Sequence, residues 1–278
     1  MFAKLLKHEW RATSGTQTGL CAAVVGLGAA GAIAVNTLIK RADSLNELAN
    51  ASLALSLFFI YLAIVICAAA SAILLMVRYY KSRFTDQGYL TFTLPVTVHQ
   101  NFLSALTNHL IWMVLMSVSV VVAFGMLLLA GYLSIGDEVM QNLKSTLTLL
   151  YGETFEVYGQ TMLKLLPIYV VQIVINTIYG VVLAMTCLTV GATIAKKRKI
   201  LAAIGIYYLI GMVSGMVQNI FTMSITIDMN DIAEGAAAQA LEVLSNQLLM
   251  VTIPVQILMM AGCYFLSITM MKKKLNLT

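Results

Sequence analysis

The sequence predicts an all-α integral membrane protein that crosses the bilayer six times, with both termini in the cytoplasm. Of its 278 residues, 60% are hydrophobic and only 10% are charged, and the mean hydropathy is +0.89. A soluble domain carries about 25% charged residues, because water must solvate its surface. The apolar residues fall into six runs, each long enough to cross a hydrocarbon layer that takes about 20 helical residues. Basic residues alternate between these runs in the way that sets membrane orientation.

The predicted spans follow the hydropathy and cover residues 15–39, 51–77, 102–133, 165–195, 200–223 and 248–271. The third and fourth are longer than the bilayer demands, so we expect them to tilt or to project beyond it. No linker divides the chain, and residues 1–278 are expected to form a single transmembrane domain.

The charges between the spans set the expected orientation. Thirteen of the 17 basic residues lie in the N-terminal segment, the second and fourth connections and the C-terminus, whereas 10 of the 12 acidic residues lie in the other connections. Lys and Arg accumulate on the cytoplasmic side of membrane proteins. We therefore expect a multi-pass protein of the plasma membrane with both termini inside the cell and with the loops over 134–164 and 224–247 outside it.

Two amphipathic helices are expected at the membrane surfaces. In residues 1–14, apolar side chains share one helical face and basic side chains take the others, which is typical of an interfacial helix on the inner leaflet. The apolar face consists of Phe2, Leu5, Leu6 and Trp10. An unstructured basic anchor is the alternative for this segment. Residues 137–163 repeat apolar side chains every three to four positions and predict a helix on the outer surface.

The middle of each predicted span lacks Asp, Glu, Lys and Arg, which disfavours an ion-driven transporter because such proteins commonly bind the driving ion with intramembrane ionisable groups. His109 is the nearest candidate, and we expect it to pack between helices. Uncharged polar residues in the spans have two interpretations: hydrogen bonds between helices, or a sparsely polar path for an amphiphilic substrate. The candidates for that path are Gln172, Asn176, Gln218 and Asn219.

Small residues recur at four-residue spacing in the first and fifth spans, which lets helix backbones approach closely within one chain or across a dimer. The candidate dimer-interface glycines are Gly19, Gly26, Gly211 and Gly215. The four cysteines lie in apolar runs without the spacing of metal ligands, so we expect four buried apolar side chains and no metal site.

The connection over 78–101 is the most informative stretch. From Arg78 to Thr97 it reads RYYKSRFTDQGYLTFTLPVT, which is unusually aromatic for a cytoplasmic connector. A merely solvated loop would not expose Phe84, Tyr89 and Phe92, so these side chains are expected to dock on the membrane, on another helix or on a partner protein.

This basic and aromatic run, the TDQGYLTFTLPVT stretch and the return into a membrane helix resemble the permease subunits of type-2 ATP-binding-cassette exporters, those of Gram-positive bacteria in particular. The likeness covers the whole chain in topology and about residues 78–103 in sequence. It implies that the connection forms a coupling helix seated on a nucleotide-binding ATPase subunit. The matching positions are Lys81, Arg83, Phe84, Asp86, Gly88, Tyr89, Leu94 and Pro95. Residues 97–100 depart from the pattern, because they lack the basic residue often found after the Leu-Pro pair.

The same resemblance implies the partners. Two copies of the ATPase would hold ATP and Mg, and a second permease copy or a homologous permease would meet this one through the first and fifth spans. The chain itself has no G-x-x-x-x-G-K-[ST] phosphate loop and no catalytic constellation, so we expect no enzyme activity and no cofactor on it. Membrane lipid is the remaining expected partner, and the charge pattern does not indicate nucleic acid.

The expected function is therefore export of a hydrophobic or amphiphilic substrate, such as an antimicrobial peptide, powered by a separate ATPase subunit. A membrane scaffold or assembly protein that transports nothing is the alternative, because amphipathic segments and small-residue rows fit it equally well.

Overall fold

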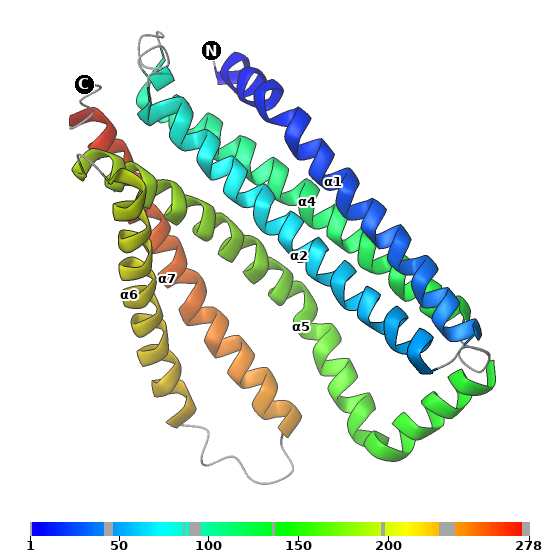
Figure 1. The fold of residues 1–278 in the computed structure, drawn as a ribbon. Helices are drawn as coiled ribbons and strands as arrows, with labels where there is room; N and C mark the ends of the chain where they lie inside the picture. The colour runs from blue at the N-terminus through cyan, green and yellow to red at the C-terminus, as the bar shows by residue number, and fades with distance from the viewer. Residues whose placement is uncertain are drawn as a thin grey trace. The chain divides into compact units, whose positions relative to one another are not determined.

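The computed structural model describes residues 2–41, 47–85, 87–88, 96–134, 137–195, 198–227 and 237–273, and nearly all of them are helical (Figure 1). Within this part of the chain there is no strand. The helices are α1 (Phe2–Arg41), α2 (Glu47–Phe84), α4 (Val98–Ser134), α5 (Asp137–Ile194), α6 (Lys199–Ile227) and α7 (Ala237–Lys273).

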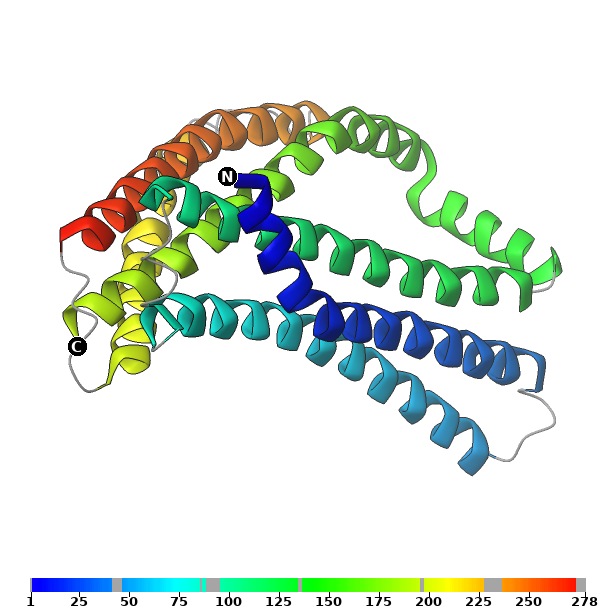
Figure 2. The same cartoon turned by 90° about the horizontal axis from the view of Figure 1, so that it is seen from above.

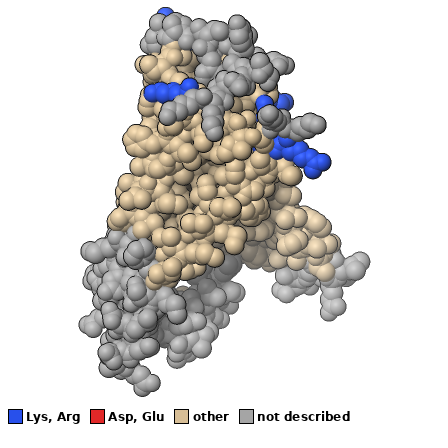
Figure 3. All heavy atoms as spheres, turned by 90° about the vertical axis from the view of Figure 1, so that its left-hand side faces the viewer, with Lys and Arg blue, Asp and Glu red and all other residues tan. Residues whose placement is uncertain are grey.

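Each of these helices contains a stretch long and apolar enough to cross a membrane, which confirms the predicted six-span fold. The stretches are Phe2–Lys40, Ala51–Phe84, Val98–Ser134, Tyr169–Ile194, Lys199–Ile220 and Thr252–Lys272. Their outer faces are apolar: Leu258 is 73% exposed, Ile220 70% and Val121 69%. On the face drawn in Figure 3, a few Lys and Arg side chains are visible, and the rest of the described surface carries neither Lys, Arg, Asp nor Glu. Such a surface requires lipid as its solvent, so the chain is a multi-pass α-helical membrane protein.

Two predicted boundaries between helices are absent. Residues 2–14 are the first turns of α1, which continues to Arg41 without interruption, although Figure 2 shows these turns bending away from the rest of the helix. Residues 137–163 are helical as predicted, and they run directly into the span of α5. Of the expected 78–101 connection, residues up to Phe84 belong to α2 and residues from Val98 belong to α4.

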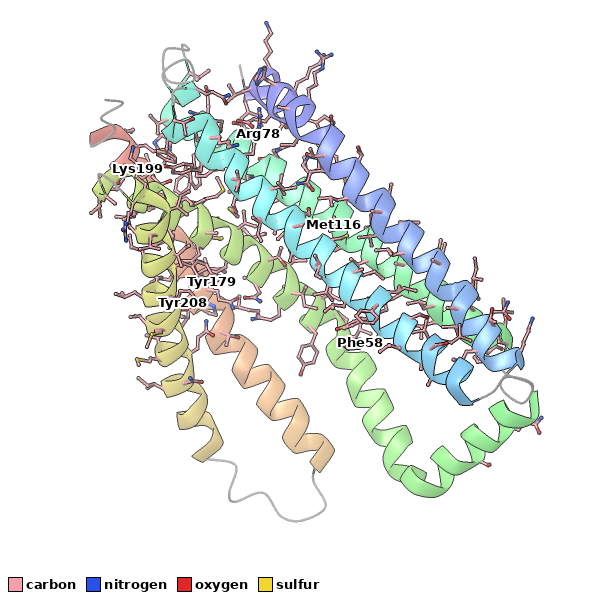
Figure 4. All side chains as sticks on the ribbon, in the orientation of Figure 1. Phe58, Arg78, Met116, Tyr179, Lys199 and Tyr208 are labelled. Atoms are coloured by element: carbon pink, nitrogen blue, oxygen red, sulfur yellow. The ribbon has the colours of Figure 1, made fainter. Side chains whose placement is uncertain are left out.

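The chain forms two compact units. Unit 1 contains Met1–Tyr79 and Leu103–Thr146, and unit 2 contains Tyr80–Phe102 and Leu147–Thr278. The core of unit 1 joins α1, α2 and α4, and Met116 in Figure 4 marks its centre. Its buried side chains are Val24, Ile64, Met116 and Ala123. Gly28 makes the close approach possible, because a Cβ on this residue would lie 2.5 Å from the Cα of Ala123.

Polar side chains fasten the start of α1 to its neighbours in unit 1. Trp112 Nε1 donates a hydrogen bond to Thr13 Oγ1 over 2.9 Å, and Gln17 Nε2 donates to the carbonyl oxygen of Ser71 over 3.1 Å. Trp10 stacks on Trp112 with ring centroids 4.4 Å apart. At Trp10, therefore, the apolar face of the predicted interfacial helix contacts protein.

The other three apolar side chains of that face are partly exposed. Phe2, Leu5 and Leu6 are half-buried, as Trp10 is. Lys4, Lys7 and the nearby basic side chains lie exposed on the opposite side. Contact between residues 2–14 and a membrane surface stays a prediction.

Unit 2 packs α5 against α6 and α7. A Cβ on Gly191 of α5 would lie 2.7 Å from the Cα of Ala203 in α6, so these two helices touch backbone to backbone. Tyr179, labelled in Figure 4, donates a hydrogen bond to Ser214 Oγ of α6 over 3.1 Å. Ser267 of α7 donates to Thr186 Oγ1 over 2.9 Å, and Thr186 in turn donates to the carbonyl oxygen of Cys263 over 3.2 Å.

The glycines that bring helices together are not those selected from the sequence. Gly28 and Gly191 meet a neighbouring backbone, whereas the selected residues have nothing within 4 Å of an added Cβ. The selected residues are Gly19, Gly26, Gly211 and Gly215. Their use in close packing, within the chain or across a dimer, stays a prediction, and no described residue lies within 4 Å of an added Cβ at any of them.

Gly28→Ala is expected to lower the melting temperature of the purified chain in detergent, because the new methyl group would force α1 and α4 apart. Overpacking of this kind costs about 1–3 kcal/mol. Gly26→Ala is the matched control, since it lies in the same helix and open space surrounds it. Alanine favours the helix more than glycine, so this control should melt at or slightly above the wild-type temperature. Equal melting temperatures for the two variants would contradict the close approach.

Candidate functional site: the segment between α2 and α4

The end of α2 is folded back on itself. Thr85 Oγ1 donates a hydrogen bond to the carbonyl oxygen of Lys81 over 2.5 Å, and the amide of Gly88 donates to the carbonyl oxygen of Thr85 over 2.7 Å. Gly88 then lies against the backbone of Arg83, where an added Cβ would be 2.8 Å from the carbonyl carbon. A side chain at position 88 would collide with a backbone that cannot yield cheaply, which explains the glycine there.

The start of α4 has its own cap. The amide of Gln100 donates to Thr97 Oγ1 over 3.3 Å, and the amide of Asn101 donates to the carbonyl oxygen of Thr97 over 3.1 Å. The Thr-x-x-Gln spacing of residues 97–100 is the pattern of a capping box, in which the first residue satisfies amides that the helix leaves without partners. The residues that depart from the exporter pattern thus begin a helix.

Arg83 joins the two ends of this segment. It is fully buried, and its Nη2 donates to the carbonyl oxygen of Asn101 over 3.0 Å and to Asn101 Oδ1 over 2.9 Å. Its Nη1 donates to Ser82 Oγ over 2.8 Å. A buried guanidinium is tolerated only where hydrogen bonds replace its hydration. The last turn of α2 is therefore fixed against the first turn of α4.

The start of α4 also contacts α7 within unit 2. His99 Nδ1 and Tyr264 Oη share a hydrogen bond of 2.9 Å, and the ring of Phe102 meets the ring of Tyr264 edge-on at 5.5 Å between centroids. Lys272 Nζ, in the last turn of α7, lies 3.5 Å from His99 Nε2. The start of α4 is thus attached to α7 as well as to the end of α2.

The predicted coupling residues occupy different environments. Lys81 is exposed, whereas Arg83, Phe84 and Gly88 are buried. Phe84 lies near Tyr80, with ring centroids 6.0 Å apart, so it docks on its own chain. The remaining predicted positions lie outside the described residues and are Asp86, Tyr89, Leu94 and Pro95. Of the described positions, Lys81 alone presents its side chain to the surroundings.

Two of the candidate path residues, Gln172 and Asn176 of α5, form a ladder of amides with Gln256 of α7. Gln172 Nε2 donates to Gln256 Oε1 over 3.3 Å, and Gln256 Nε2 donates to Asn176 Oδ1 over 3.5 Å. This arrangement matches the interpretation of such residues as hydrogen bonds between helices. Gln218 and Asn219 of α6 are half-buried and exposed, respectively. Whether a substrate passes these residues stays a prediction.

His109 packs inside the protein as expected, and two of the four cysteines are buried as expected. His109 is buried, its Nδ1 lies 2.8 Å from the carbonyl oxygen of Ala105, and its ring meets Tyr79 edge-on. The cysteines are free thiols, of which Cys187 and Cys263 are buried and the other two half-buried. Within the described part of the chain, no group of three His, Cys, Asp or Glu side chains could hold a metal ion.

Sequence reasoning missed Asn101 and Tyr264, which hold the segment in place. Asn101 carried a signal, because a polar amide at the start of a predicted span needs a partner. Tyr264 carried none, because an aromatic residue near the end of a span is ordinary.

Comparisons with known proteins identify no family for this chain. No protein-family model, no curated protein and no solved structure matches the chain. Its six apolar helices place it among multi-pass membrane proteins.

Arg83→Ala is expected to open the segment. The substitution removes a buried guanidinium and the hydrogen bonds that it donates to Asn101, and leaving buried partners without their bonds costs about 1–3 kcal/mol. Chymotrypsin should then cut faster within residues 84–97, as peptide mass spectrometry of digested full-length protein would show. Lys81→Ala, at an exposed position two residues away, is the control and should digest at the wild-type rate. Unchanged digestion of Arg83→Ala would contradict the joining role.

Proposed function

We propose that the chain is the transmembrane permease subunit of an ATP-binding-cassette exporter, which moves a hydrophobic or amphiphilic substrate out of the cell. A separate ATPase subunit, present in two copies, binds ATP and Mg and acts on the segment between α2 and α4. A second copy of the chain or a homologous permease completes the path. The protein lies in the plasma membrane with both termini in the cytoplasm.

One observation carries this proposal: the last turn of α2 and the first turn of α4, which bound the segment between them, are fixed to each other. Arg83 fastens these two turns together, and both helix ends are capped by their own side chains. A connector that only joined two spans would not require a buried guanidinium. An element that must receive a push does require fixed ends, because a slack loop would absorb the movement. The resemblance of residues 78–103 to exporter permeases supports the same role.

The substrate class follows from the amide ladder and its surroundings. The ladder lies on helices whose described outer faces are apolar, and it carries no charge. Gln172 Oε1 is buried and has no hydrogen-bond partner among the described residues, so it can accept a bond from a donor that enters. An amphiphile with a few N–H or O–H groups, such as a membrane-active peptide, suits this combination.

Purification of the tagged chain from its native membranes tests the proposal. A nucleotide-binding ATPase should copurify, and inside-out vesicles that hold both proteins should accumulate hydrophobic dyes or membrane-active peptides only with ATP. Capture of other membrane proteins without an ATPase, together with vesicles that accumulate nothing, would favour a scaffold instead.

Lys81→Glu is expected to weaken ATPase retention about tenfold and to change its salt dependence, because reversing an exposed charge at an interface alters association by this order. Lys40→Glu reverses an exposed charge at the C-terminal end of α1 and serves as the control, for which ATPase retention should be unchanged. Quantitative pull-down at increasing salt measures both variants. Equal retention by the two would remove Lys81 from the contact with the ATPase.

A further inference from the structure

One side chain of α7 is held by two residues in the first turns of α4. Tyr264 shares a 2.9 Å hydrogen bond with His99 and packs edge-on against Phe102. His99 and Phe102 are three residues apart in α4, so they share one face of that helix. Their contacts combine a polar bond with an aromatic packing contact, and the two together fix the position of the Tyr264 ring.

The same turns of α4 are held at Asn101 by Arg83. Asn101 lies between His99 and Phe102 in the sequence and therefore points to another side of the helix. The start of α4 is thus bonded to the end of α2 on one side and to α7 on another. A displacement of this turn must move Tyr264 or break its contacts.

Two further sets of hydrogen bonds join α7 to α5. The first is the Thr186 hydroxyl, which joins Ser267 and the carbonyl oxygen of Cys263. The second is the amide ladder at Gln256. Gln256 lies eight residues before Tyr264, which is about 12 Å along a helix of 1.5 Å rise per residue. The hydrogen-bonded backbone of α7 spans this distance without interruption.

We propose that α7 transmits movement of the two helix ends that bound the segment between α2 and α4 to the amide ladder, and that Tyr264 is the positioning residue that makes the connection. The proposal rests on the proposed function, which makes this segment the place where the ATPase acts. Transmission runs from Arg83 and Asn101 through His99 and Phe102 to Tyr264, and then along α7 to Gln256. Tyr264 contacts no substrate and acts only through the position of its helix.

The connection is tested first without any ATPase. Tyr264→Phe removes the hydroxyl and keeps the ring against Phe102, so the variant is expected to fold. Losing one hydrogen bond should raise amide hydrogen exchange in residues 96–104 about twofold to tenfold in the purified full-length chain. Exchange in residues 252–260 should rise as well. Tyr208→Phe, which removes a hydroxyl from an exposed tyrosine of α6, is the control and should change neither peptide.

Coupling between two sites is reciprocal, which supplies a second measurement. Gln256→Leu alters the ladder, and it should change exchange in residues 96–104 although it lies far from them along α7. In the Tyr264→Phe background this remote effect should disappear. A remote effect of equal size in both backgrounds would overturn the role of Tyr264.

Replacements of His99 separate the polar bond from general damage. His99→Asn keeps a polar atom at the position of Nδ1 and should hold exchange in residues 96–104 within about twofold of wild type, whereas His99→Ala should match Tyr264→Phe. Identical behaviour of the Asn and Ala variants would show that the hydrogen bond makes no connection.

Reconstituted complexes with the ATPase give the functional outcome. Tyr264→Phe should retain the ATPase and its ATP hydrolysis. It should export about a third or less of the wild-type amount of substrate per ATP, as expected for loss of one hydrogen bond in the transmission. Wild-type substrate export per ATP in this variant would refute transmission through Tyr264 and leave the exporter proposal intact. If no ATPase binds the chain, the exporter proposal fails, and the exchange measurements still decide the connection.

Discussion

Hydrocarbon neither accepts nor donates hydrogen bonds, and the described polar contacts between the membrane-spanning helices depend on that constraint. A polar group that enters a lipid-facing bundle must find its partner inside the protein, since the cost of leaving it without one amounts to several kcal/mol. The partners are found across helices: Thr13 with Trp112, Gln17 with Ser71, and Thr186 with Ser267. Each bond fixes the rotation and height of one helix relative to another. Apolar packing alone could not do this, because lipid chains compete equally well for an apolar surface.

The second consequence concerns how closely helices approach. Without a hydrophobic force between helices in lipid, attraction comes from packing at short range, and a missing side chain permits the shortest range. Among the described glycines, Gly28 against Ala123 and Gly191 against Ala203 bring the backbones of two helices together. Both pairs set a glycine against an alanine on the other helix. A four-residue spacing within one helix does not identify such a pair, because the pair also depends on which residue of the other helix lies opposite.

That distinction explains which features the sequence can predict. The six spans follow from hydropathy alone, because each depends only on the composition of its own segment. The shared face of Gln172 and Asn176 also follows from spacing, since residues four apart lie together on any helix. Their common partner Gln256 and the partner of His99, Tyr264, both lie on α7. No local pattern within α5 or α4 specifies a residue on another helix. The predicted boundary at residue 14 is absent because the bend in α1 does not interrupt its helical hydrogen bonds.

The placement of Arg83 bears most directly on function. The sequence marked this residue as a contact for a partner, and the structure buries it inside its own chain. A buried charge is a poor source of stability, since an apolar side chain of similar size often serves as well or better. What the guanidinium adds is geometry: Nη2 donates to two acceptors of Asn101 while Nη1 donates to Ser82 of its own helix. Because the guanidinium is planar, these bonds fix how the last turn of α2 is oriented on the first turn of α4. The same turns of α4 contact Tyr264, so the orientation of the end of α2 is linked to α7.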